Sequence, residues 1–312
     1  MDQKINSILL LKPLFKERIW GGTKLNQYGY KLPSDQIGEC WGISGHPHGE
    51  SIILNGESRG KTLSVVYQDH PEWFNNPKDS TFPLLVKIID AKEDLSVQVH
   101  PDDVYAMQHE NQRGKHEAWI VLEAAESTRI QLGHRAPDSK TFKTMVDQKQ
   151  WDKLLQYKPL SQDDVIDIKP GTLHALCAGT MVLEVQQSSD VTYRVFDYNR
   201  LDAHGNLRSL HLKQAIEVTT APFIDPPKTK LNRRLFNHIQ TLVENNHFKI
   251  EALGVEKSIT LNHTRYRLVT VIEGEMSMNG ILLKKGDHCI VTSQISSLEV
   301  TGQGWLIMAE AR

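Results

Sequence analysis

Polar side chains occupy every second position of the short segment LSVQVHP. Because side chains alternate between the two faces of a β-strand, Ser96, Gln98 and His100 share one face, and the apolar residues between them share the other. An amide oxygen and an imidazole nitrogen on a common face can bind a metal together. A polar row along a strand is also typical of a face that contacts water, so this row needs further ligands before it indicates a site.

Two more groups could complete such a site. Glu117 lies in KHEAWIVLEA, where it shares a strand face with Lys115. His174 follows a Pro–Gly pair that suits the two central positions of a type II turn, and it stands among apolar residues. Taken alone, each fits an ordinary structural role: an exposed glutamate in the first case and a buried core histidine in the second.

Together these residues offer a ligand set of one amide oxygen, two imidazoles and one carboxylate: Gln98, His100, Glu117 and His174. Zinc accepts nitrogen and oxygen ligands, and a set without cysteine that leaves positions open is typical of a catalytic site rather than a structural one. With a single carboxylate the site keeps a net positive charge and would act as a Lewis acid. The same ligand types admit Zn, Mn, Fe and Co. We therefore predict one divalent-metal site inside a β-barrel.

Short β-strands are the elements that would position these groups. Strand-like runs occur at 82–91, 95–100, 118–124, 164–168, 181–187 and 192–196, and others fill the C-terminal segment. Helical spacing is confined to 101–110, 139–157 and 212–219. Many short strands separated by turn residues predict an all-β sandwich or barrel. The sequence contains neither GxGxxG nor GxxxxGK[ST], so we expect neither a dinucleotide site nor a P-loop.

The composition is ordinary for a globular protein, with 39% hydrophobic and 24% charged residues and a formal net charge of −2 over 312 residues. Lysine and arginine are scattered, whereas duplex binding leaves a concentrated basic footprint, so nucleic acid is not an expected partner. Three widely separated cysteines fit a reducing compartment. No apolar run reaches the length of a secretory signal or the roughly 18 residues of a membrane span. We therefore predict a cytoplasmic protein.

Longer blocks surround the candidate ligands in a fixed order. They are ERIWGGTKL (17–25), GECWGISGHP (38–47), FPLLVKIIDAKEDLSVQVHPDD (82–103), KHEAWIVLEA (115–124), PGTLHAL (170–176), LEVQQSSDVTYRVFDYNR (183–200) and LDAHGNLRSLHLKQA (201–215). In this order the blocks resemble the type I mannose-6-phosphate isomerase family, and the short bacterial form in particular. An ordered series of blocks is far more specific than any single motif.

The resemblance implies a cupin metalloenzyme that interconverts mannose 6-phosphate and fructose 6-phosphate, with one zinc ion per chain. It implies that the metal ligands are Gln98, His100, Glu117 and His174. It also places the active-site arginine of the family on Arg194 and the lysine two residues before the glutamate ligand on Lys115.

Two positions depart from the pattern of that family. Gly114 stands where many relatives have histidine, and His116 stands where another residue type is usual. This difference removes support for a proton-transfer role of a histidine beside the lysine. The long helical domain of the larger relatives is reduced here to roughly residues 126–165.

The predicted fold is mainly β, with two cupin-like (jelly-roll) β-barrel domains. The connector APFIDPPK carries three prolines within six residues, which excludes a helix or a central strand. We predict a catalytic metal-binding cupin domain over residues 1–225, with a small helical insert near 126–165, and a degenerate cupin-like β domain over 226–312. The second domain contains His263 and His288 but no QxH pair or second carboxylate set, so we expect it to bind no metal.

Aldose–ketose isomerisation moves a proton between C1 and C2 through an enediol, and the metal suits the role of electrophile. Lys115 projects toward the metal, whose charge would lower the lysine pKa for proton transfer, and binding of substrate as a simple cation is an equal alternative. Arg194 suits a phosphate or an enediolate, and its alternative is a structural ion pair with Asp190 or Asp197. We predict further substrate contacts from Lys87, Trp20 and His46, with a core role as the alternative for Trp20.

Two other functions stay open at this point. One is a non-catalytic regulatory cupin that binds sugar phosphate, and the other is an iron-dependent cupin oxygenase, which basic residues suited to phosphate do not favour. The expected partner is a small-molecule sugar phosphate, without nucleic acid or membrane. The sequence does not decide between a monomer and a small homo-oligomer.

Overall fold

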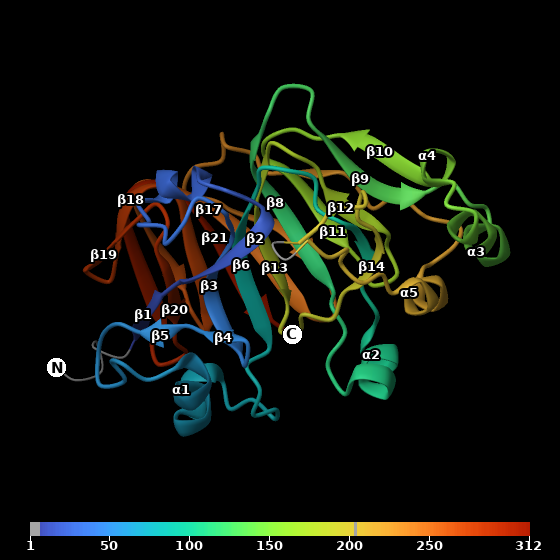
Figure 1. Cartoon of the computed structure of the whole chain (residues 1–312). Coiled ribbons are helices and arrows are strands. Elements are labelled where there is room, and N and C mark those ends of the chain that lie inside the picture. Colours follow the sequence, from blue (N-terminus) through green and yellow to red (C-terminus); the bar gives the residue numbers. More distant parts are fainter. Residues whose placement is uncertain (1–6, 203–204) are drawn as a thin grey trace.

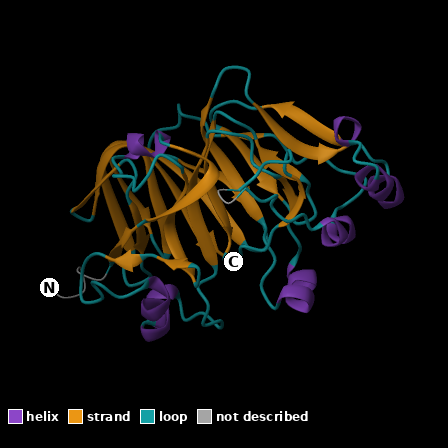
Figure 2. Ribbon diagram, viewed as in Figure 1, coloured by secondary structure: helices purple, strands orange, loops and turns teal. Residues whose placement is uncertain are grey.

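The computed structural model describes residues 7–202 and 205–312, and most of its regular structure is β-strand (Figures 1 and 2). The strands form three antiparallel sheets, two with eight strands and one with five. The prediction of a mainly β fold is therefore confirmed. Within the described ranges, no helix has the length and apolar character needed to cross a membrane.

The first eight-stranded sheet contains the strand that begins at Glu117. Its order is β15 (Thr229–Lys230), β11 (Asp164–Ile168), β8 (Glu117–Ala124), β13 (Thr180–Gln187), β6 (Leu84–Ala91), β3 (Ile37–His46) and β2 (Leu14–Gly22), and β4 (Gly49–Glu50) pairs with β3. We call it the central sheet, because its two faces pack against the two other sheets.

A five-stranded sheet packs against one face of the central sheet. Its order is β10 (Leu155–Pro159), β9 (Arg129–His134), β12 (His174–Leu176), β7 (Val97–Val99) and β14 (Tyr193–Phe196). A shared apolar cluster joins the two sheets, with Trp119 and Val182 from the central sheet and Leu132 and Leu176 from the five-stranded sheet. Two predicted ligand segments, those of Gln98 and His174, therefore lie on adjacent strands of one sheet.

The second eight-stranded sheet, here called the C-terminal sheet, packs against the other face of the central sheet. Its order is β16 (Ile239–Glu244), β17 (Phe248–Asn262), β21 (Ser297–Ala311), β18 (Arg267–Met278), β20 (His288–Val291), β1 (Ile8–Lys12) and β5 (Ile52–Ile53), and β19 (Ile281–Lys284) pairs with β18. The large core between the two sheets includes Ile88 and Ile120 on one side and Phe248 and Ile307 on the other.

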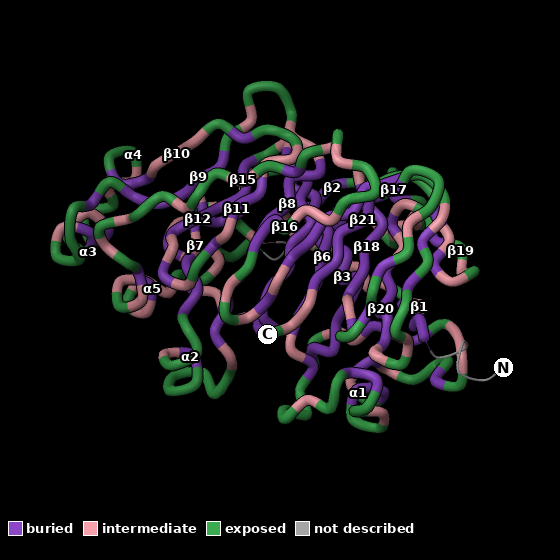
Figure 3. The backbone as a smooth tube through the Cα atoms, turned by 180° about the vertical axis from the view of Figure 1, so that it is seen from behind, coloured by how far each residue is buried: buried purple, intermediate pink, exposed green. Residues whose placement is uncertain are grey.

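Alternation along each central strand decides which side chains reach which face. In β6, Leu84, Val86 and Ile88 enter the core shared with the C-terminal sheet, whereas Lys87 and Ile89 face the five-stranded sheet. The strands of the central sheet are therefore buried on both faces, as the buried tube segments of Figure 3 show. Burial on both faces explains why 82–91 reads as a nearly continuous apolar run.

Helices are short and lie at the edges of the sheets (Figure 2). They are α1 (Leu63–Asp69), α2 (Asp103–Glu110), α3 (Ser139–Asp147), α4 (Trp151–Leu154) and α5 (Leu212–Val218), with 3-10 turns at η2 (Lys24–Tyr28) and η3 (Pro71–Phe74). Asp102 caps α2 by accepting a hydrogen bond from the Tyr105 backbone N–H over 2.9 Å. The helices predicted over 101–110 and 212–219 are thus confirmed.

The helix predicted over 139–157 is not continuous, because α3 and α4 occupy 139–147 and 151–154 and the last three residues are strand. Lys149 adopts a positive φ of 53°, which ends the first helix, and the chain becomes strand at Leu155. The predicted insert near 126–165 is likewise not purely helical, because β9 and β10 belong to the five-stranded sheet.

The two predicted domains share a sheet. Strand β1, at the start of the chain, pairs with β20 through Ile8 opposite Val291 and Leu11 opposite His288. The connector after residue 221 therefore does not separate the sheets. The division into 1–225 and 226–312 stays a prediction, and its first six residues lie outside the described part of the chain.

Candidate active site

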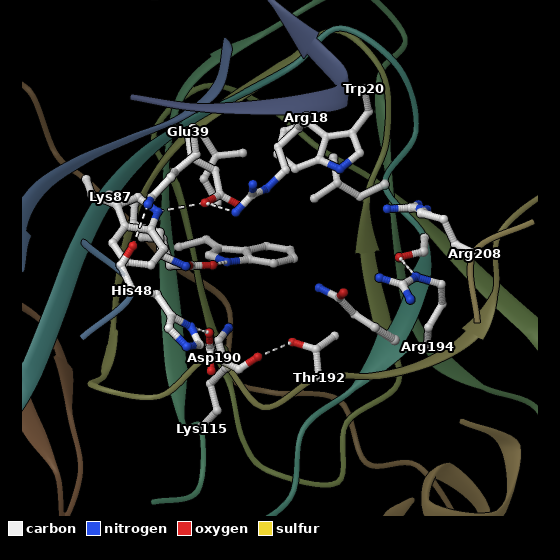
Figure 4. Close-up of a pocket in the computed structure, with 18 residues that line it drawn as sticks. Arg18, Trp20, Glu39, His48, Lys87, Lys115, Asp190, Thr192, Arg194 and Arg208 are labelled. Atoms are coloured by element: carbon white, nitrogen blue, oxygen red, sulfur yellow. Dashed lines mark hydrogen bonds and ion pairs between the residues drawn. The ribbon is translucent and has the colours of Figure 1, made fainter. Parts of the chain in front are cut away.

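A polar cavity of about 440 Å³ opens between the central and the five-stranded sheets. Figure 4 shows Arg194 and Arg208 on one side and Lys87 and His48 on the opposite side, with Trp20 and Lys115 at the two ends. Of the predicted site residues, this pocket is lined by Trp20, Lys87, Gln98, Lys115 and Arg194. The remaining ligand candidates are fully buried directly beyond Lys115 and Trp119.

The structure brings together three of the four predicted metal ligands. His174 Nε2 lies 3.2 Å from Glu117 Oε1, and His100 Nε2 lies 3.4 Å from Glu117 Oε2. All three side chains are 1% exposed or less, so no bulk water contacts them. Long-range sheet packing makes this cluster, since the three residues come from the end of β7, the start of β8 and the start of β12.

Backbone carbonyls orient both imidazoles. His100 Nδ1 lies 2.9 Å from the Val191 carbonyl oxygen, and His174 Nδ1 lies 2.8 Å from the Thr172 carbonyl oxygen. A carbonyl only accepts, so each Nδ1 carries the proton and donates it, which leaves each Nε2 with a free lone pair. Such outer contacts fix the tautomer of metal-binding histidines.

The ligand atoms of these three side chains fit a divalent cation. His174 Nε2 and Glu117 Oε1 are buried and make no hydrogen bond, although buried polar atoms are nearly always partnered. Two acceptors 3.2 Å apart cannot satisfy each other, whereas a cation between them satisfies both. An imidazole–imidazole–carboxylate set also matches the ligand preference of zinc.

Gln98 extends this set along the five-stranded sheet. It pairs directly with His174 on β12 and with Arg194 on β14. Side chains at directly opposed positions share a face of the sheet, so the three form one row. The predicted alternation is confirmed for 96–100, because Val97 and Val99 enter the outer core, but Leu95 departs from it and lines the pocket with Ser96.

Burial and neighbouring charges shift the pKa values of His100 and Glu117. Burial, followed by the positive charge of Lys115, lowers the pKa of His100 to about 3. Burial alone would raise the pKa of Glu117, but the Lys115 ammonium and His100 outweigh it and hold that pKa well below its usual range. The donors are therefore in the forms that bind metal, a neutral imidazole and a carboxylate.

Lys115 contacts the donors on one side and lines the pocket on the other. Its Nζ forms a very short ion pair with Glu117 and lies 3.2 Å from His100 Nε2. Burial would lower the lysine pKa, but Glu117 and Glu184 outweigh burial, so the protein groups raise it. The sequence interpretation expected a metal ion to lower the Lys115 pKa. The protein groups alone shift this pKa the other way, because the carboxylates of Glu117 and Glu184 surround the lysine.

Arg194 makes no ion pair with Asp190 or Asp197 among the described residues. Its Nε donates to Ser96 Oγ over 3.2 Å, and its NH1 donates to the Ser209 carbonyl oxygen over 2.9 Å. Both acceptors are neutral, so its positive charge has no carboxylate partner. Burial, followed by the charge of the nearby Arg208, lowers the pKa of Arg194.

Asp197 instead serves two other guanidinium groups. Arg200 donates to Asp197 over 2.7 Å, and Arg208 donates to it from Nε over 2.6 Å. Arg200 NH1 also lies 3.9 Å from Glu93 Oε2. Asp197 and Glu93 together therefore balance two of the three arginines and leave one net positive charge, that of Arg194, on this side of the pocket. We call Arg194, Arg200 and Arg208 the arginine cluster.

Lys87 lies across the pocket from the arginines, and Trp20 lies at one of its ends (Figure 4). Lys87 Nζ lies 3.2 Å from Glu184 Oε1, and Glu184 also accepts a 2.9 Å hydrogen bond from the Trp119 indole. Lys87 is therefore already neutralised by a buried carboxylate. Trp20 is 4% exposed and belongs to the core between the two sheets, and it also lines the pocket, so it combines the two roles proposed for it from sequence.

His46 is buried beside the pocket rather than among its lining residues. Its Nδ1 accepts a 3.2 Å hydrogen bond from the His48 backbone N–H, and its Nε2 lies 3.8 Å from Asp190 Oδ1. His48 forms a very short contact with the same carboxylate. Donor atoms of the three side chains lie within 4.8 Å of one another. Because His46 Nδ1 accepts from the backbone, its Nε2 carries the proton, so His46 offers Asp190 a proton and not the lone pair that a second metal site would need.

The sequence interpretation missed part of the pocket. Arg18 reaches it from β2 and makes a bidentate ion pair of 3.0 and 3.1 Å with Glu39, whose carboxylate also accepts from the Trp41 indole over 2.7 Å. Alternation of Arg18 with Trp20 in ERIWGG was a usable signal for a shared face. Arg208 had no such signal, because only the tertiary fold brings the loop after β14 back to the pocket.

Comparison with known proteins gives consistent matches. Residues 8–119 match the phosphomannose isomerase type I catalytic domain, and residues 238–310 match the mannose-6-phosphate isomerase cupin domain, which confirms the predicted cupin fold. The mannose-6-phosphate isomerase ManA of Bacillus subtilis (strain 168) is 40% identical over 308 residues, covering 96% of this chain and 98% of that protein.

Solved structures agree with these matches. The crystal structure of the mannose 6-phosphate isomerase from Bacillus subtilis is 38% identical and has a TM-score of 0.92, covering 98% of this chain and 100% of that chain. A zinc-bound mannose 6-phosphate isomerase is 14% identical and has a TM-score of 0.78 over 98% of this chain and 100% of that chain, which shows a common fold.

Proposed function

The chain belongs to the type I phosphomannose isomerase family, and on this premise we propose that its pocket interconverts mannose 6-phosphate and fructose 6-phosphate with one zinc ion per chain. One observation supports the proposal most strongly. Unpartnered buried ligand atoms of Glu117 and His174 lie beyond the Lys115 end of a pocket, and one side of this pocket carries Arg194, a cation without a carboxylate partner. A sugar phosphate presents oxygens to the buried ligand atoms and a dianion to the arginine side.

Four residues would hold the zinc ion: His100, Glu117 and His174, with Gln98 beside them. The bound ion supplies a Lewis acid that stabilises negative charge on the oxygens of C1 and C2. The protein contributes its orientation, because the Val191 and Thr172 carbonyls keep both imidazole lone pairs aimed inward. Since only one ligand is charged, the site retains positive charge for the reacting oxygens.

Lys115 would hold the proton that a substrate oxygen needs as the enediol forms. Its raised pKa keeps it an ammonium at neutral pH, so it approaches the substrate as a proton donor and a cation. Lys115 contacts Glu117 and His100 and also lines the pocket, which places the proton beside the reacting end. Proton transfer between C1 and C2 through an enediol is the chemistry that this donor would assist.

The arginine cluster would bind the phosphate. A phosphate monoester carries close to two negative charges at neutral pH, and the cluster offers it Arg194, a guanidinium without a carboxylate partner, beside the ion-paired Arg208. Arg194 and Arg208 line the pocket, and Ser96 already receives a hydrogen bond from Arg194. Lys87 is a weaker candidate, because Glu184 neutralises it.

Buried aromatic and ion-paired side chains would exclude water and hold the sugar. Trp20 and Trp119 line the pocket and are 4% and 1% exposed. Arg18 with Glu39 and Lys87 with Glu184 add charged groups that are already paired, so they offer hydrogen bonds to sugar hydroxyls without adding net charge. Trp20, Lys87 and His46 stay predicted substrate contacts on this basis.

Turnover before and after chelation tests the proposal. Purified protein is assayed for conversion of mannose 6-phosphate to fructose 6-phosphate, and its zinc content is measured in parallel. We expect about one zinc per chain, loss of turnover with a chelator and recovery on zinc addition. Protein with stoichiometric zinc and no turnover would contradict the proposal and would favour the regulatory sugar-phosphate-binding alternative.

A further inference from the structure

His116 stands between two site residues but faces away from the pocket. Lys115 and Glu117 face the pocket and its buried donors, and alternation of side chains turns His116 to the opposite side. There it is 6% exposed, and its Nε2 hydrogen-bonds Asp167 Oδ1 over 2.8 Å. Asp167 belongs to β11, the neighbouring strand of the central sheet.

The C-terminal sheet reaches this histidine through the turn between β16 and β17. Asn245 Nδ2 donates to the same Asp167 Oδ1 over 3.4 Å and lies 3.3 Å from His116 Nε2. Rings of His247 and Phe248 pack edge-on against His116, with centroids 5.6 and 5.4 Å away.

The turn is itself well fixed. Asn245 Oδ1 accepts the backbone N–H groups of His247 and Phe248 over 2.9 and 3.0 Å, and the Asn245 N–H donates to the Phe248 carbonyl. Phe248 is fully buried in the core between the two eight-stranded sheets. The groups that contact His116 are therefore anchored to the C-terminal sheet and not to a free loop.

The backbone at His116 and Gly114 is fixed by side chains of β13 and α2. Gln187 Oε1 accepts the His116 N–H over 2.9 Å, and Gln187 Nε2 donates to Asp103 over 3.0 Å. Asp103 also accepts the Gly114 N–H over 2.8 Å. A Cβ at residue 114 would lie 2.4 Å from the carbonyl carbon of Asp102, so only glycine allows this close approach. The backbone N–H groups of residues 114 and 116 are thus both held by the hydrogen-bonded pair Asp103 and Gln187.

From these contacts we infer that His116 is a positioning residue, through which Asn245 and Asp167 hold the strand that directs Lys115 and Glu117 at the reacting end. The C-terminal sheet would thus serve the reaction by bracing this strand. The expected change in kcat rests on the proposed function, whereas the expected change in zinc affinity can be measured without any turnover. A small displacement of an aligned catalytic group is enough to lower a rate strongly.

Asn245→Asp tests the brace with little change in shape. It keeps the Oδ1 acceptor that fixes the turn and replaces the Nδ2 donor with an oxygen that repels Asp167. We expect kcat to fall about 10-fold at saturating zinc and the zinc dissociation constant, measured by chelator competition, to rise about 10-fold. KM is expected to stay within about two-fold of wild type, because the arginine cluster lies on other segments.

Asn279→Asp provides a matched control. Asn279 lies in the turn between β18 and β19, where its Oδ1 likewise accepts a backbone N–H, that of Glu299, over 2.8 Å. It contacts no residue of the strand that carries Glu117, so kcat and zinc affinity should stay at wild-type values. The double variant Asn245→Asp/Asp167→Asn restores a donor–acceptor pair and should recover both kcat and zinc affinity.

A second pair of variants tests the same inference if the Asn245→Asp protein does not fold. His116→Gln keeps a donor for Asp167 and should retain most activity, whereas His116→Leu should show the losses in kcat and zinc affinity. The inference is overturned if Asn245→Asp matches wild type, if Asn279→Asp loses as much, or if the double variant fails to recover. If wild-type protein shows no isomerase turnover, the proposed function fails, while the zinc affinities still decide the role of His116.

Discussion

The five-stranded and C-terminal sheets each bury histidines, and among the described residues only those of the five-stranded sheet join a metal-ligand set. Burial lowers the pKa of His100 and that of His288 to about 3, so both imidazoles are neutral. His100 leaves its Nε2 free of backbone partners and beside a carboxylate, together with His174. Burial and neutrality are therefore common to both regions, and the convergence of acceptors distinguishes them.

His288 shows the opposite arrangement. Its Nε2 lies 3.0 Å from the Tyr30 hydroxyl, and its Nδ1 lies 2.9 Å from Thr270 Oγ1. Its ring also fills the space left by Gly42, where a Cβ would lie 2.2 Å from the ring. Among the described residues, the clusters with metal-ligand geometry include neither His288 nor His263. A histidine whose two ring nitrogens both have hydrogen-bond partners is therefore a packing residue, however deeply it is buried.

His100→Ala should produce the largest effect and separates the two regions most sharply. It removes one of two imidazole ligands, so zinc per chain should fall from about one to near zero, and turnover should fall by at least about 10²–10³-fold. His288→Gln is the control and should retain zinc and turnover. Zinc analysis and the isomerase assay on both proteins measure the contrast. A metal-free His100→Ala protein with wild-type turnover would refute the site assignment.

Arg194→Ala tests the side of the pocket that carries the arginine cluster. Losing a charged hydrogen bond worth about 1.5–3 kcal/mol should lower kcat/KM by about 10- to 100-fold. Zinc should stay bound, because Arg194 contacts none of the buried donors in the structure. Steady-state kinetics with parallel zinc analysis checks this, and a loss of zinc equal to that of His100→Ala would show that the arginine cluster and the buried ligands are not separate.

The smallest effect concerns the pH dependence of stability. Between pH 6.5 and pH 3 the unfolded chain binds a proton at His288 that the folded chain does not, so stability falls as pH falls, by about 1.4 kcal/mol per pH unit. His288→Gln removes this contribution. The difference in unfolding free energy between pH 7 and pH 5 should therefore be about 2 kcal/mol smaller in the variant than in wild type. Urea unfolding at the two pH values measures it, and identical pH dependence would contradict a buried neutral His288.

Local patterns in the sequence were sufficient for much of the fold. Alternation in LSVQVH correctly separated Gln98 and His100 from the core-facing valines, because a strand obeys a period of two whatever packs against it. The positive φ of Lys149, which cuts the helix predicted over 139–157, depends on packing that periodicity does not record. The pairing of β1 with β20 is set by contacts far apart in the chain, so no local pattern predicts it.

The same limit applies to the site. The structure brings His100, Glu117 and His174 together as the prediction required, and their metal-binding role stays a prediction. The pKa of Lys115 could not be predicted from its neighbours in sequence, because Glu184, from another strand, contributes to raising it. Arg208 reaches Asp197 only because the loop after β14 folds back toward the pocket. Sequence order therefore could not show that two other arginines pair with Asp197 and leave Arg194 without a carboxylate partner.

Anomalous diffraction from crystals of the zinc-loaded protein tests the central claim most directly. We expect one strong zinc peak per chain, within about 2.0–2.2 Å of Glu117 Oε1, His100 Nε2 and His174 Nε2, and no peak beside His288. A principal peak elsewhere, such as at His48 and Asp190, would contradict the assignment of the buried donors as the metal site.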